Sequence, residues 1–316
     1  MRWRPSSVLV LLVAGLTACG GTAAPGTAAG ERTRTVEHAM GSTEVPAQVE
    51  RVVVLDTGEL DAVVSLGVTP VGAVTTDVST SLVSYLDDEL AGTRAVGTIG
   101  EPDLEAIAAL DPDLVLSNTV RHQELYAQLS RIAPTVMAGD VGDTWKQTLL
   151  LAGDALDRRE GAEQLIADYE QRAAEVGARV PGGDPAAVTA SVVRFLPGQI
   201  RLYGRASFIG TVLDDAGLSR PGSQQVEETF TEVSPEQISL ADGDLVFTTT
   251  YGDPDATQAA EVTGGPLWER LDAVARGDVH EVPDDTWMLG IGVTAAHLVL
   301  DDLEAALAGG TSGSDR

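Results

Sequence analysis

Polar and apolar residues follow a helical period over one long stretch of the chain, residues 158–180 (RREGAEQLIADYEQRAAEVGARV). Apolar side chains recur at spacings of three and four with charged residues between them, which predicts a helix with one buried face. Such a helix would be roughly 30 Å long. Strands and helices are predicted on both sides of it, so we interpret it as a rigid linker between two lobes. A surface helix of one large α/β domain is the alternative.

Short apolar runs bounded by turn residues predict the remaining elements. In the first lobe, residues 33–157, we expect a hairpin over 33–45, strands at 51–55, 71–74, 114–116 and 135–137, and helices at 60–66, 82–90, 104–110 and 124–132. In the second lobe, residues 181–308, we expect strands at 188–195, 200–203, 245–247 and 279–282, and helices at 208–216, 267–275 and 293–307. Alternation of this kind predicts an α/β fold in which each lobe has a mainly parallel sheet flanked by helices.

One sequence pattern occurs in both lobes. Residues 105–116 (EAIAALDPDLVL) resemble residues 236–247 (EQISLADGDLVF). In both copies a glutamate, Glu105 or Glu236, stands six residues before an aspartate, and an apolar strand follows a second aspartate. The match predicts lobes of related architecture. The alternative is that helix–turn–strand units generally look alike.

The first 32 residues have the composition of a sorting signal and a tether. Arg2 and Arg4 precede an apolar run that is too short to span a membrane, and the run ends at Cys19, the only cysteine of the chain. We expect a lipoprotein signal over residues 1–18, lipid attachment at Cys19 and a flexible Gly/Ala/Thr/Pro tether over 19–32. The predicted location is the extracytoplasmic face of the cell membrane, and residues 309–316 are expected to be a disordered tail.

Charge and motif content exclude several classes of function. The chain has 48 acidic and 20 basic residues and a net charge of −28, which argues against nucleic acid, and against a membrane surface beyond the lipid anchor, as a partner. No nucleophile elbow, phosphate-binding loop or dinucleotide-binding motif occurs, and the four histidines match no metal-ligand spacing. We therefore expect no enzyme and no bound metal. Ser207 near Asp214 is the one candidate catalytic pair for the alternative, an exported hydrolase.

Arginine and aromatic residues collect where predicted strands end. Ligands of open α/β sheets bind beyond the carboxyl ends of the strands, where arginine can hold ligand oxygens and flat rings can cover an apolar skeleton. The candidate ligand-binding residues are Arg121, Trp145, Arg194, Arg201, Tyr203, Arg205, Tyr251 and Trp287. For each arginine a surface ion pair is the alternative role, and for each ring the alternative is core packing.

Several segments, in this order and spacing, resemble the iron–siderophore substrate-binding lipoproteins of ABC importers, especially those of actinobacteria. They are residues 97–105 (GTIGEPDLE), 111–116 (DPDLVL), 132–136 (IAPTV), 142–145 (GDTW), 201–204 (RLYG), 207–208 (SF) and 217–221 (GLSRP). The resemblance covers residues 36–307.

The resemblance implies a monomer of two lobes joined by one long helix, with little hinge motion. A ferric siderophore would lie between the lobes as the transported ligand, with no other cofactor, and an ABC permease dimer would receive it. Haem or cobalamin is the alternative ligand within this fold. Arg121, Trp145, Arg194, Tyr203, Tyr251 and Trp287 match segments that line the cleft, and Arg201 and Arg205 match more weakly. Glu105 and Glu236 match glutamates that project from each lobe toward the permease.

Overall fold

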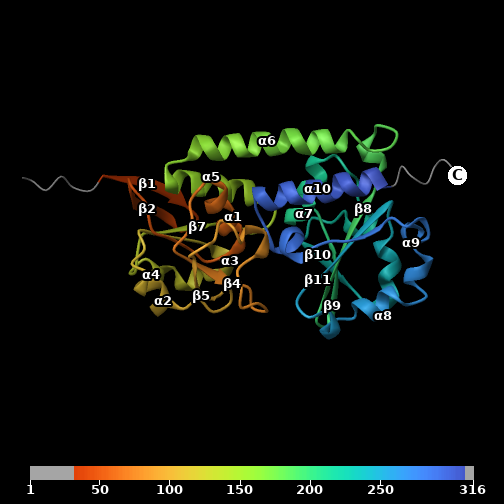
Figure 1. The fold of residues 1–316 in the computed structure, drawn as a ribbon, viewed down its shortest axis with the longest axis horizontal. Helices are drawn as coiled ribbons and strands as arrows, with labels where there is room; N and C mark the ends of the chain where they lie inside the picture. Colours follow the sequence, from red (N-terminus) through yellow and green to blue (C-terminus); the bar gives the residue numbers. More distant parts are fainter. Residues whose placement is uncertain (1–31, 310–316) are drawn as a thin grey trace, which may run out of the picture. The chain divides into compact units, whose positions relative to one another are not determined.

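The computed structural model describes residues 32–309 of the 316-residue chain (Figure 1). The predicted signal segment, Cys19 and the tether up to residue 31 lie outside the described residues, as does the tail from residue 310. Within residues 32–309, no helix combines the length and the apolar character that crossing a membrane requires.

The first lobe contains a hairpin and a five-stranded sheet. The hairpin pairs β1 (Thr33–His38) with β2 (Gly41–Pro46). The sheet has the order β5-β4-β3-β6-β7, and each of its neighbouring pairs is parallel. Its strands are β3 (Val52–Val54), β4 (Gly72–Thr75), β5 (Arg94–Thr98), β6 (Leu114–Asn118) and β7 (Thr135–Ala138). Every residue of β3 and β6 is buried, as expected for a parallel sheet covered on both faces.

The second lobe contains a mixed sheet with the order β10-β9-β8-β11-β12. Its strands are β8 (Ala190–Leu196), β9 (Gln199–Tyr203), β10 (Phe230–Val233), β11 (Leu245–Thr250) and β12 (Val279–Glu281). The strands β8, β11 and β12 are parallel, whereas β9 and β10 are antiparallel to their neighbours. A tight turn at Gly198, with φ 74°, joins β8 directly to β9 and makes that pair antiparallel.

Helices cover both sheets. The α-helices are α1 (Thr57–Ser65), α2 (Leu104–Ala109), α3 (Thr119–His122), α4 (Tyr126–Leu129), α5 (Trp145–Leu156), α6 (Arg159–Gly177), α7 (Phe208–Asp215), α8 (Ala259–Thr263), α9 (Asp272–Arg276) and α10 (Val293–Gly309). Short 3-10 turns are η1 (Ser84–Leu86), η2 (Gln123–Leu125), η3 (Pro185–Ala187), η4 (Gly222–Gln224), η5 (Pro235–Ala241), η6 (Pro254–Ala256) and η7 (Trp268–Arg270), and η8 (Asp285–Leu289) is a turn of π-helix.

The long helix predicted at residues 158–180 is confirmed as α6. Its buried face includes Ala162, Tyr169, Ala173 and Val176, and it packs along α5 and α10 (Figure 1). Because α6 follows the last helix of the first lobe and leads through η3 into β8, it is the linker between the two sheets. The predicted fold class, two α/β lobes joined by one long helix, is therefore confirmed.

Some predicted elements differ from the structure. The segment predicted as a helix at residues 82–90 contains only the turn η1, and the helix predicted at 124–132 is divided into η2 and α4. The strand β5 and the helix α5 were missed. No helix was predicted around Trp145, whereas α5 begins at that residue and ends at Leu156, just before the left-handed residue Asp157, with φ 59°.

The repeated sequence pattern has the same structural role in both lobes. Oδ2 of Asp113 accepts hydrogen bonds from the backbone N–H groups of Glu50 and Arg51, both at 2.9 Å, just before β3. Oδ2 of Asp244 accepts the backbone N–H of Thr189 at 2.8 Å, just before β8. Each aspartate thus joins the beginnings of two neighbouring parallel strands, and this shared task accounts for the predicted relation between the lobes.

A buried carboxylate on α1 holds the N-terminus of α10. Asp61 is fully buried and accepts hydrogen bonds from Thr294 N (3.1 Å), Ala295 N (3.1 Å), Tyr85 Oη (3.0 Å) and Ser65 Oγ (3.1 Å). Burial raises the pKa of Asp61, and the four donors oppose that shift. A Cβ atom on Gly292 would lie 2.3 Å from Asp61, so only glycine permits this close approach. Asp61 therefore ties the first lobe to the helix that closes the second.

We predict that Asp61→Asn lowers the free energy of unfolding by about 2–3 kcal/mol, because an amide loses the charge and turns an N–H group toward donors. Chemical denaturation measures this difference. Asp87 is an exposed acid of the same lobe, and Asp87→Asn should change the value by no more than about 0.5 kcal/mol. Equal stability of the two variants would contradict the role assigned to Asp61.

Candidate functional site

A cavity of about 360 Å³ lies at the carboxyl ends of the strands and is lined from both lobes. Five of the eight predicted ligand-binding residues line it: Arg121, Arg194, Arg201, Tyr203 and Trp287. Its apolar wall includes Val120, Phe208, Phe230, Met288 and Ile291, and no carboxylate of the described residues lines it. A larger groove of about 710 Å³ runs along the start of α6, but it brings together no comparable set of arginine and aromatic side chains.

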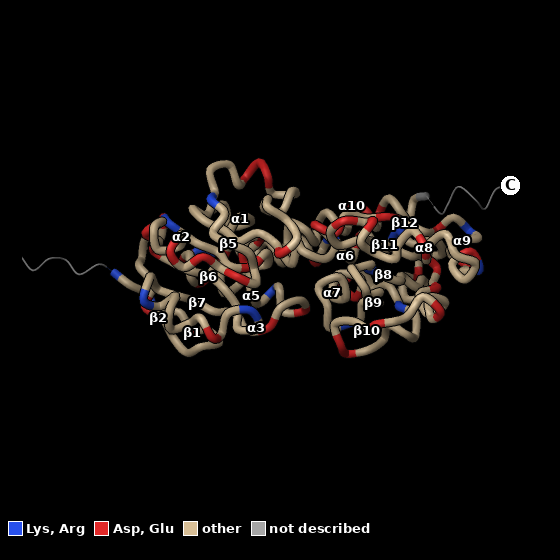
Figure 2. Tube along the Cα trace, turned by 90° about the horizontal axis from the view of Figure 1, so that it is seen from below, with Lys and Arg blue, Asp and Glu red and all other residues tan. Residues whose placement is uncertain are grey.

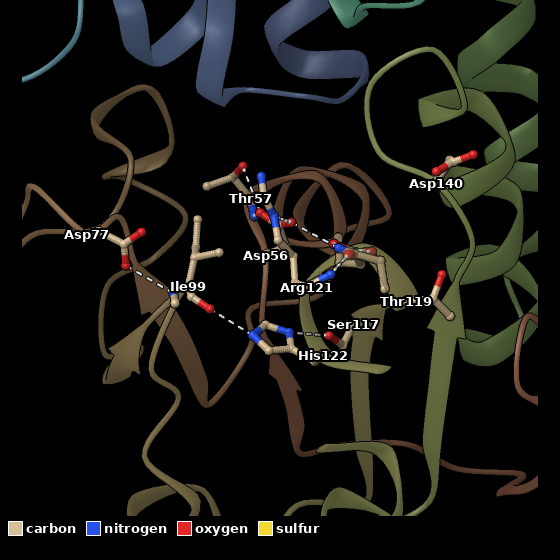
Figure 3. A network of polar contacts seen from close by, with 12 residues as sticks. Asp56, Thr57, Asp77, Ile99, Ser117, Thr119, Arg121, His122 and Asp140 are labelled. Carbon is tan, nitrogen blue, oxygen red and sulfur yellow. Dashed lines mark hydrogen bonds and ion pairs between the residues drawn. The ribbon is translucent and has the colours of Figure 1, made fainter. Parts of the chain in front are cut away.

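Arg121 lines the cavity and is held by Asp56 (Figure 3). It lies on α3, directly after β6, and Figure 2 shows a basic segment at α3 in a chain with more acidic than basic segments. Its Nε donates to Oδ2 of Asp56 at 3.1 Å, and its side chain is 42% exposed whereas that of Asp56 is 1% exposed. Among the described residues, its two terminal nitrogens have no partner. The arginine therefore offers two fixed donors to a ligand oxygen.

The carboxylate below Arg121 belongs to a buried polar cluster of Asp56, Glu59 and Asn118. Asn118 Nδ2 donates to Oδ2 of Asp56 at 2.9 Å and lies 3.3 and 3.4 Å from the two oxygens of Glu59. Asn118 Oδ1 accepts the backbone N–H of Arg121 at 3.0 Å. Burial, followed by the charge of Asp56, raises the pKa of Glu59 to about 8, so Glu59 is mainly protonated at neutral pH.

His122 stands beside this cluster as a neutral buried side chain. Its Nδ1 lies 2.7 Å from Ser117 Oγ and its Nε2 lies 2.8 Å from the carbonyl oxygen of Ile99 (Figure 3). Since a carbonyl only accepts, Nε2 carries the proton and Nδ1 accepts from the serine hydroxyl. Burial lowers the pKa of His122, which keeps the ring uncharged. His122 therefore fixes the position of α3 and adds no charge.

Arg194, from β8, is engaged by the protein itself. Its Nε and Nη2 bind both oxygens of Asp284, at 2.7 and 2.5 Å, and its Nη1 donates to Tyr203 Oη at 3.1 Å. Tyr251 covers the guanidinium, 4.6 Å from the ring centre. Burial raises the pKa of Asp284, and the ion pair with Arg194 opposes that shift. Each nitrogen of Arg194 thus already has a partner, so its main task is to fix the cavity wall.

Arg201, from β9, has no carboxylate partner among the described residues. Its Nε and Nη2 donate to Oε1 of Gln199 at 3.0 and 2.7 Å, and its guanidinium stacks on Phe230, 4.0 Å from the ring centre. Nη1 has no partner within the described part of the chain. The aromatic ring and the amide hold the charge in place without neutralising it, so Arg201 presents positive charge to the cavity from the second lobe.

The other predicted rings and Arg205 have different positions. Trp145 lies outside the cavity wall: it is buried, donates through Nε1 to Thr211 Oγ1 at 2.9 Å and packs edge-on against Tyr169 and Phe208. Its alternative role, core packing, is the one the structure displays. Trp287 lines the cavity but is fully buried, and its Nε1 donates to Asp302 at 2.8 Å. Arg205 pairs with Asp214 at 3.3 Å, outside the lining.

The candidate catalytic pair has structural roles. Ser207 Oγ donates to the carbonyl of Gly204 at 2.7 Å and accepts the N–H of Gly210 at 2.9 Å, which makes it the N-cap of α7. Asp214 is ion-paired with Arg205. Within residues 32–309, no three His, Cys, Asp or Glu side chains form a group that could hold a metal ion. These contacts do not favour a hydrolytic centre.

Several contributors to the site were missed in the sequence. Asp56 and Asn118 follow the neighbouring parallel strands β3 and β6, so the strand-end rule that selected Arg121 also points to them. Phe230 and Asp284 had no comparable signal, because their partners Arg201 and Arg194 are 29 and 90 residues away in the chain.

The predicted docking glutamates are both exposed, each in the first turn of a short helix. Glu105 follows the cap of α2, where Asp103 accepts the N–H groups of Glu105 and Ala106, both at 3.0 Å. Glu236 lies in η5, and a hydrogen bond from Ser234 lowers its pKa. Helix-cap stabilisation remains the alternative role for both carboxylates.

Comparison with known proteins identifies relatives of the whole chain. The family model described as "Periplasmic binding protein" matches residues 52–286. The probable siderophore-binding lipoprotein YfiY of Bacillus subtilis is 37% identical over 311 residues, which cover 94% of this chain and 95% of YfiY. The achromobactin-binding periplasmic protein of Dickeya dadantii is 33% identical, with 83% and 88% covered.

Solved structures of similar fold include Staphylococcus aureus SirA in complex with staphyloferrin B. It has a TM-score of 0.79 and 34% identity, and the match covers 87% of this chain and 99% of SirA. The two sheets, the linker helix and the cavity between the lobes thus accompany a sequence match over most of the chain, and the protein belongs to the periplasmic binding protein family.

Proposed function

We propose that this protein captures a ferric siderophore outside the cytoplasmic membrane and delivers it to an ABC importer. The observation that carries the proposal is the cavity at the strand ends, to which Arg121 and Arg201 turn free donors from opposite lobes. The names of the relatives support it: YfiY is called a siderophore-binding lipoprotein, a further relative an Fe(3+)-citrate-binding protein, and SirA was crystallised with staphyloferrin B. These names favour a siderophore over haem or cobalamin.

The charge of the cavity favours an anionic chelate rich in oxygen. Arg121 and Arg194 are balanced by Asp56 and Asp284, whereas Arg201 is unbalanced and no carboxylate lines the wall. A negative chelate would gain hydrogen bonds from the terminal fork of Arg121 and from Nη1 of Arg201, and Phe230 and Met288 would cover its apolar parts. A cationic chelate would lack a counter-charge.

We predict that Arg121→Ala and Arg201→Ala each weaken binding of ferric staphyloferrin B by about 1.5–3 kcal/mol, the value of a hydrogen bond to a charged group. This is roughly a ten- to hundredfold rise in Kd. Quenching of tryptophan fluorescence during titration measures it. Arg131→Ala, an exposed arginine of the first lobe outside the cavity, serves as the control and should bind like the wild type. Wild-type affinity in both test variants would place the chelate elsewhere.

Docking to the permease is assigned to Glu105 and Glu236. Their exposure at matching places of the repeated pattern supports the assignment, since a two-fold symmetric permease would contact both lobes in the same way.

We predict that the double change Glu105→Arg and Glu236→Arg leaves chelate affinity unchanged and abolishes uptake into cells, because basic residues would then face the basic docking sites expected on the permease. Uptake of radiolabelled iron as ferric staphyloferrin B measures the effect. Glu124→Arg with Glu261→Arg, two exposed acids outside the repeat, provide a matched change in charge. Normal uptake by the double variant would leave only the helix-cap role.

Lipid attachment at Cys19 is proposed from the sequence and from the relatives described as lipoproteins. Cys19→Ser should release the protein from the membrane fraction, because the serine hydroxyl cannot replace the thiol that receives the lipid. Chelate affinity should not change. Fractionation of cells followed by immunoblotting tests the prediction, and full membrane retention of the variant would refute it.

A further inference from the structure

Two acids at the start of α1 lie beneath the cavity without lining it. Asp56 is 2% exposed and Glu59 is 4% exposed. Asn118 Nδ2 donates to both acids. Arg121, which lines the cavity, donates to Asp56 (Figure 3). Asp56 has a clear task, because it is the counter-charge of Arg121. Glu59 touches neither Arg121 nor the cavity wall, and its burial calls for an explanation.

The hydrogen bonds of the two acids differ in number and quality. Asp56 accepts from Thr57 N at 2.8 Å, Asn118 Nδ2 at 2.9 Å and Arg121 Nε at 3.1 Å. Glu59 accepts from Asn118 Nδ2 at 3.3 and 3.4 Å, a donor that it shares with Asp56, and its own backbone N–H gives it a second hydrogen bond. A buried carboxylate normally needs two or three good donors or a cation of its own. Glu59 forms no ion pair of its own and shares its side-chain donor with Asp56, at longer distances than Asp56 does, so the geometry favours its uncharged acid form.

We propose that Glu59 is a positioning residue for Arg121: as an uncharged acid it leaves Asp56 as the single buried counter-charge, so that Arg121 remains directed toward the ligand. The proposal rests on the proposed function and deepens it. A second negative charge beside Asp56 would draw the guanidinium inward and reduce the positive potential at the cavity. A proton on Glu59 and an anionic chelate on Arg121 therefore favour each other.

Few other groups act on Glu59. The charges that affect it are Asp56, at the start of the same helix, and Arg121, on α3. His122 of α3 is neutral, with its pKa lowered by burial, and it does not titrate above pH 7. Asp61, two residues along α1, directs its oxygens toward Ser65, Tyr85 and α10 instead. A change of charge at Glu59 would therefore act mainly on the Asp56–Arg121 pair.

The direction of the pH effect follows from the raised pKa of Glu59, about 8. Below this pH, Glu59 is protonated in both the free and the bound protein, so its titration should not make the affinity for the chelate depend on pH. Above it, binding an anion requires the uptake of a proton, so affinity falls with rising pH. Linkage to a single proton limits this fall to about tenfold per pH unit.

The test compares the wild type with Glu59→Gln, which mimics the protonated acid, using ferric staphyloferrin B from pH 6.5 to 9.5. We expect the wild-type Kd to rise about three- to tenfold between pH 7 and 9 relative to Glu59→Gln. Titration of the chelate itself affects both proteins and cancels in the ratio. Glu124→Gln, an exposed acid of the same lobe, should follow the wild type.

Calorimetry at pH 8 in buffers of different ionisation enthalpy gives a second readout. In the wild type, Glu59 should take up a fraction of a proton when the chelate binds. Glu59→Gln lacks this contribution, so its total proton uptake should be smaller by the same amount. Parallel pH profiles for these two proteins, or equal proton uptake, would overturn the proposal. A Glu59→Gln variant that binds poorly at pH 7 would also count against it, because the mimic is expected to preserve Arg121.

The stability of the protein without ligand tests the protonation of Glu59 independently of chelate binding, and therefore independently of the proposed function. The pKa of Glu59 is about 8 in the folded protein and 4.5 in the unfolded chain, so the unfolded chain releases the proton first. The free energy of unfolding of the wild type therefore falls as pH rises between these two values. The stability advantage of Glu59→Gln over the wild type should therefore grow between pH 5 and 8 and then level off. If the difference in stability between the two proteins stayed constant from pH 5 to 8, the claim that Glu59 is uncharged would be wrong. No binding of the chelate by any variant, with the growing difference intact, would instead refute the function.

Discussion

A charge removed from water needs a partner, and this constraint decides how the cavity is built. The chain carries 48 acidic residues, yet none of those within residues 32–309 lines the cavity. The acids near it lie beneath the arginines: Asp56 holds Arg121 by one nitrogen and Asp284 holds Arg194 by two. The number of guanidinium nitrogens that donate to protein acceptors determines how many donors remain for a ligand. Arg121 keeps its terminal fork, whereas Arg194 is committed to the wall.

The fold supplies these partners by bringing strand ends together. Asp56 follows β3 and Asn118 follows the neighbouring parallel strand β6, so both point to one edge of the first sheet. In the second lobe the hairpin of β8 and β9 places Arg194 directly opposite Arg201 in register. The antiparallel pair thus carries two arginines side by side at the cavity. A wholly parallel second sheet would need a long crossover between these strands and would separate the two residues in the chain.

How much could be read from the sequence depended on whether the signal was local. The linker helix α6, the apolar strands and the exposed first-turn acids Glu105 and Glu236 follow from spacing within a few residues, and the described structure contains them. Arg121 and Arg201 were selected by the strand-end rule, and both line the cavity. The burial of Trp145 was not found, because its neighbours Tyr169 and Thr211 are 24 and 66 positions away. The engagement of Arg194 depends on Asp284, which no local pattern links to it.

The helix α1 has two structural roles. Its first turn carries Asp56 and Glu59, which set the charge beneath Arg121, and one turn later Asp61 receives the N-terminus of α10. From the same junction, Ile291 lines the cavity while its carbonyl oxygen would lie 3.1 Å from a Cβ on Gly58. The contact that ties the lobes together and the charge that faces the ligand are therefore built on one rigid helix of nine residues. A change in the position of α1 would alter both the width of the cavity and the direction of Arg121. This accounts for the number of buried polar groups that hold the helix in place.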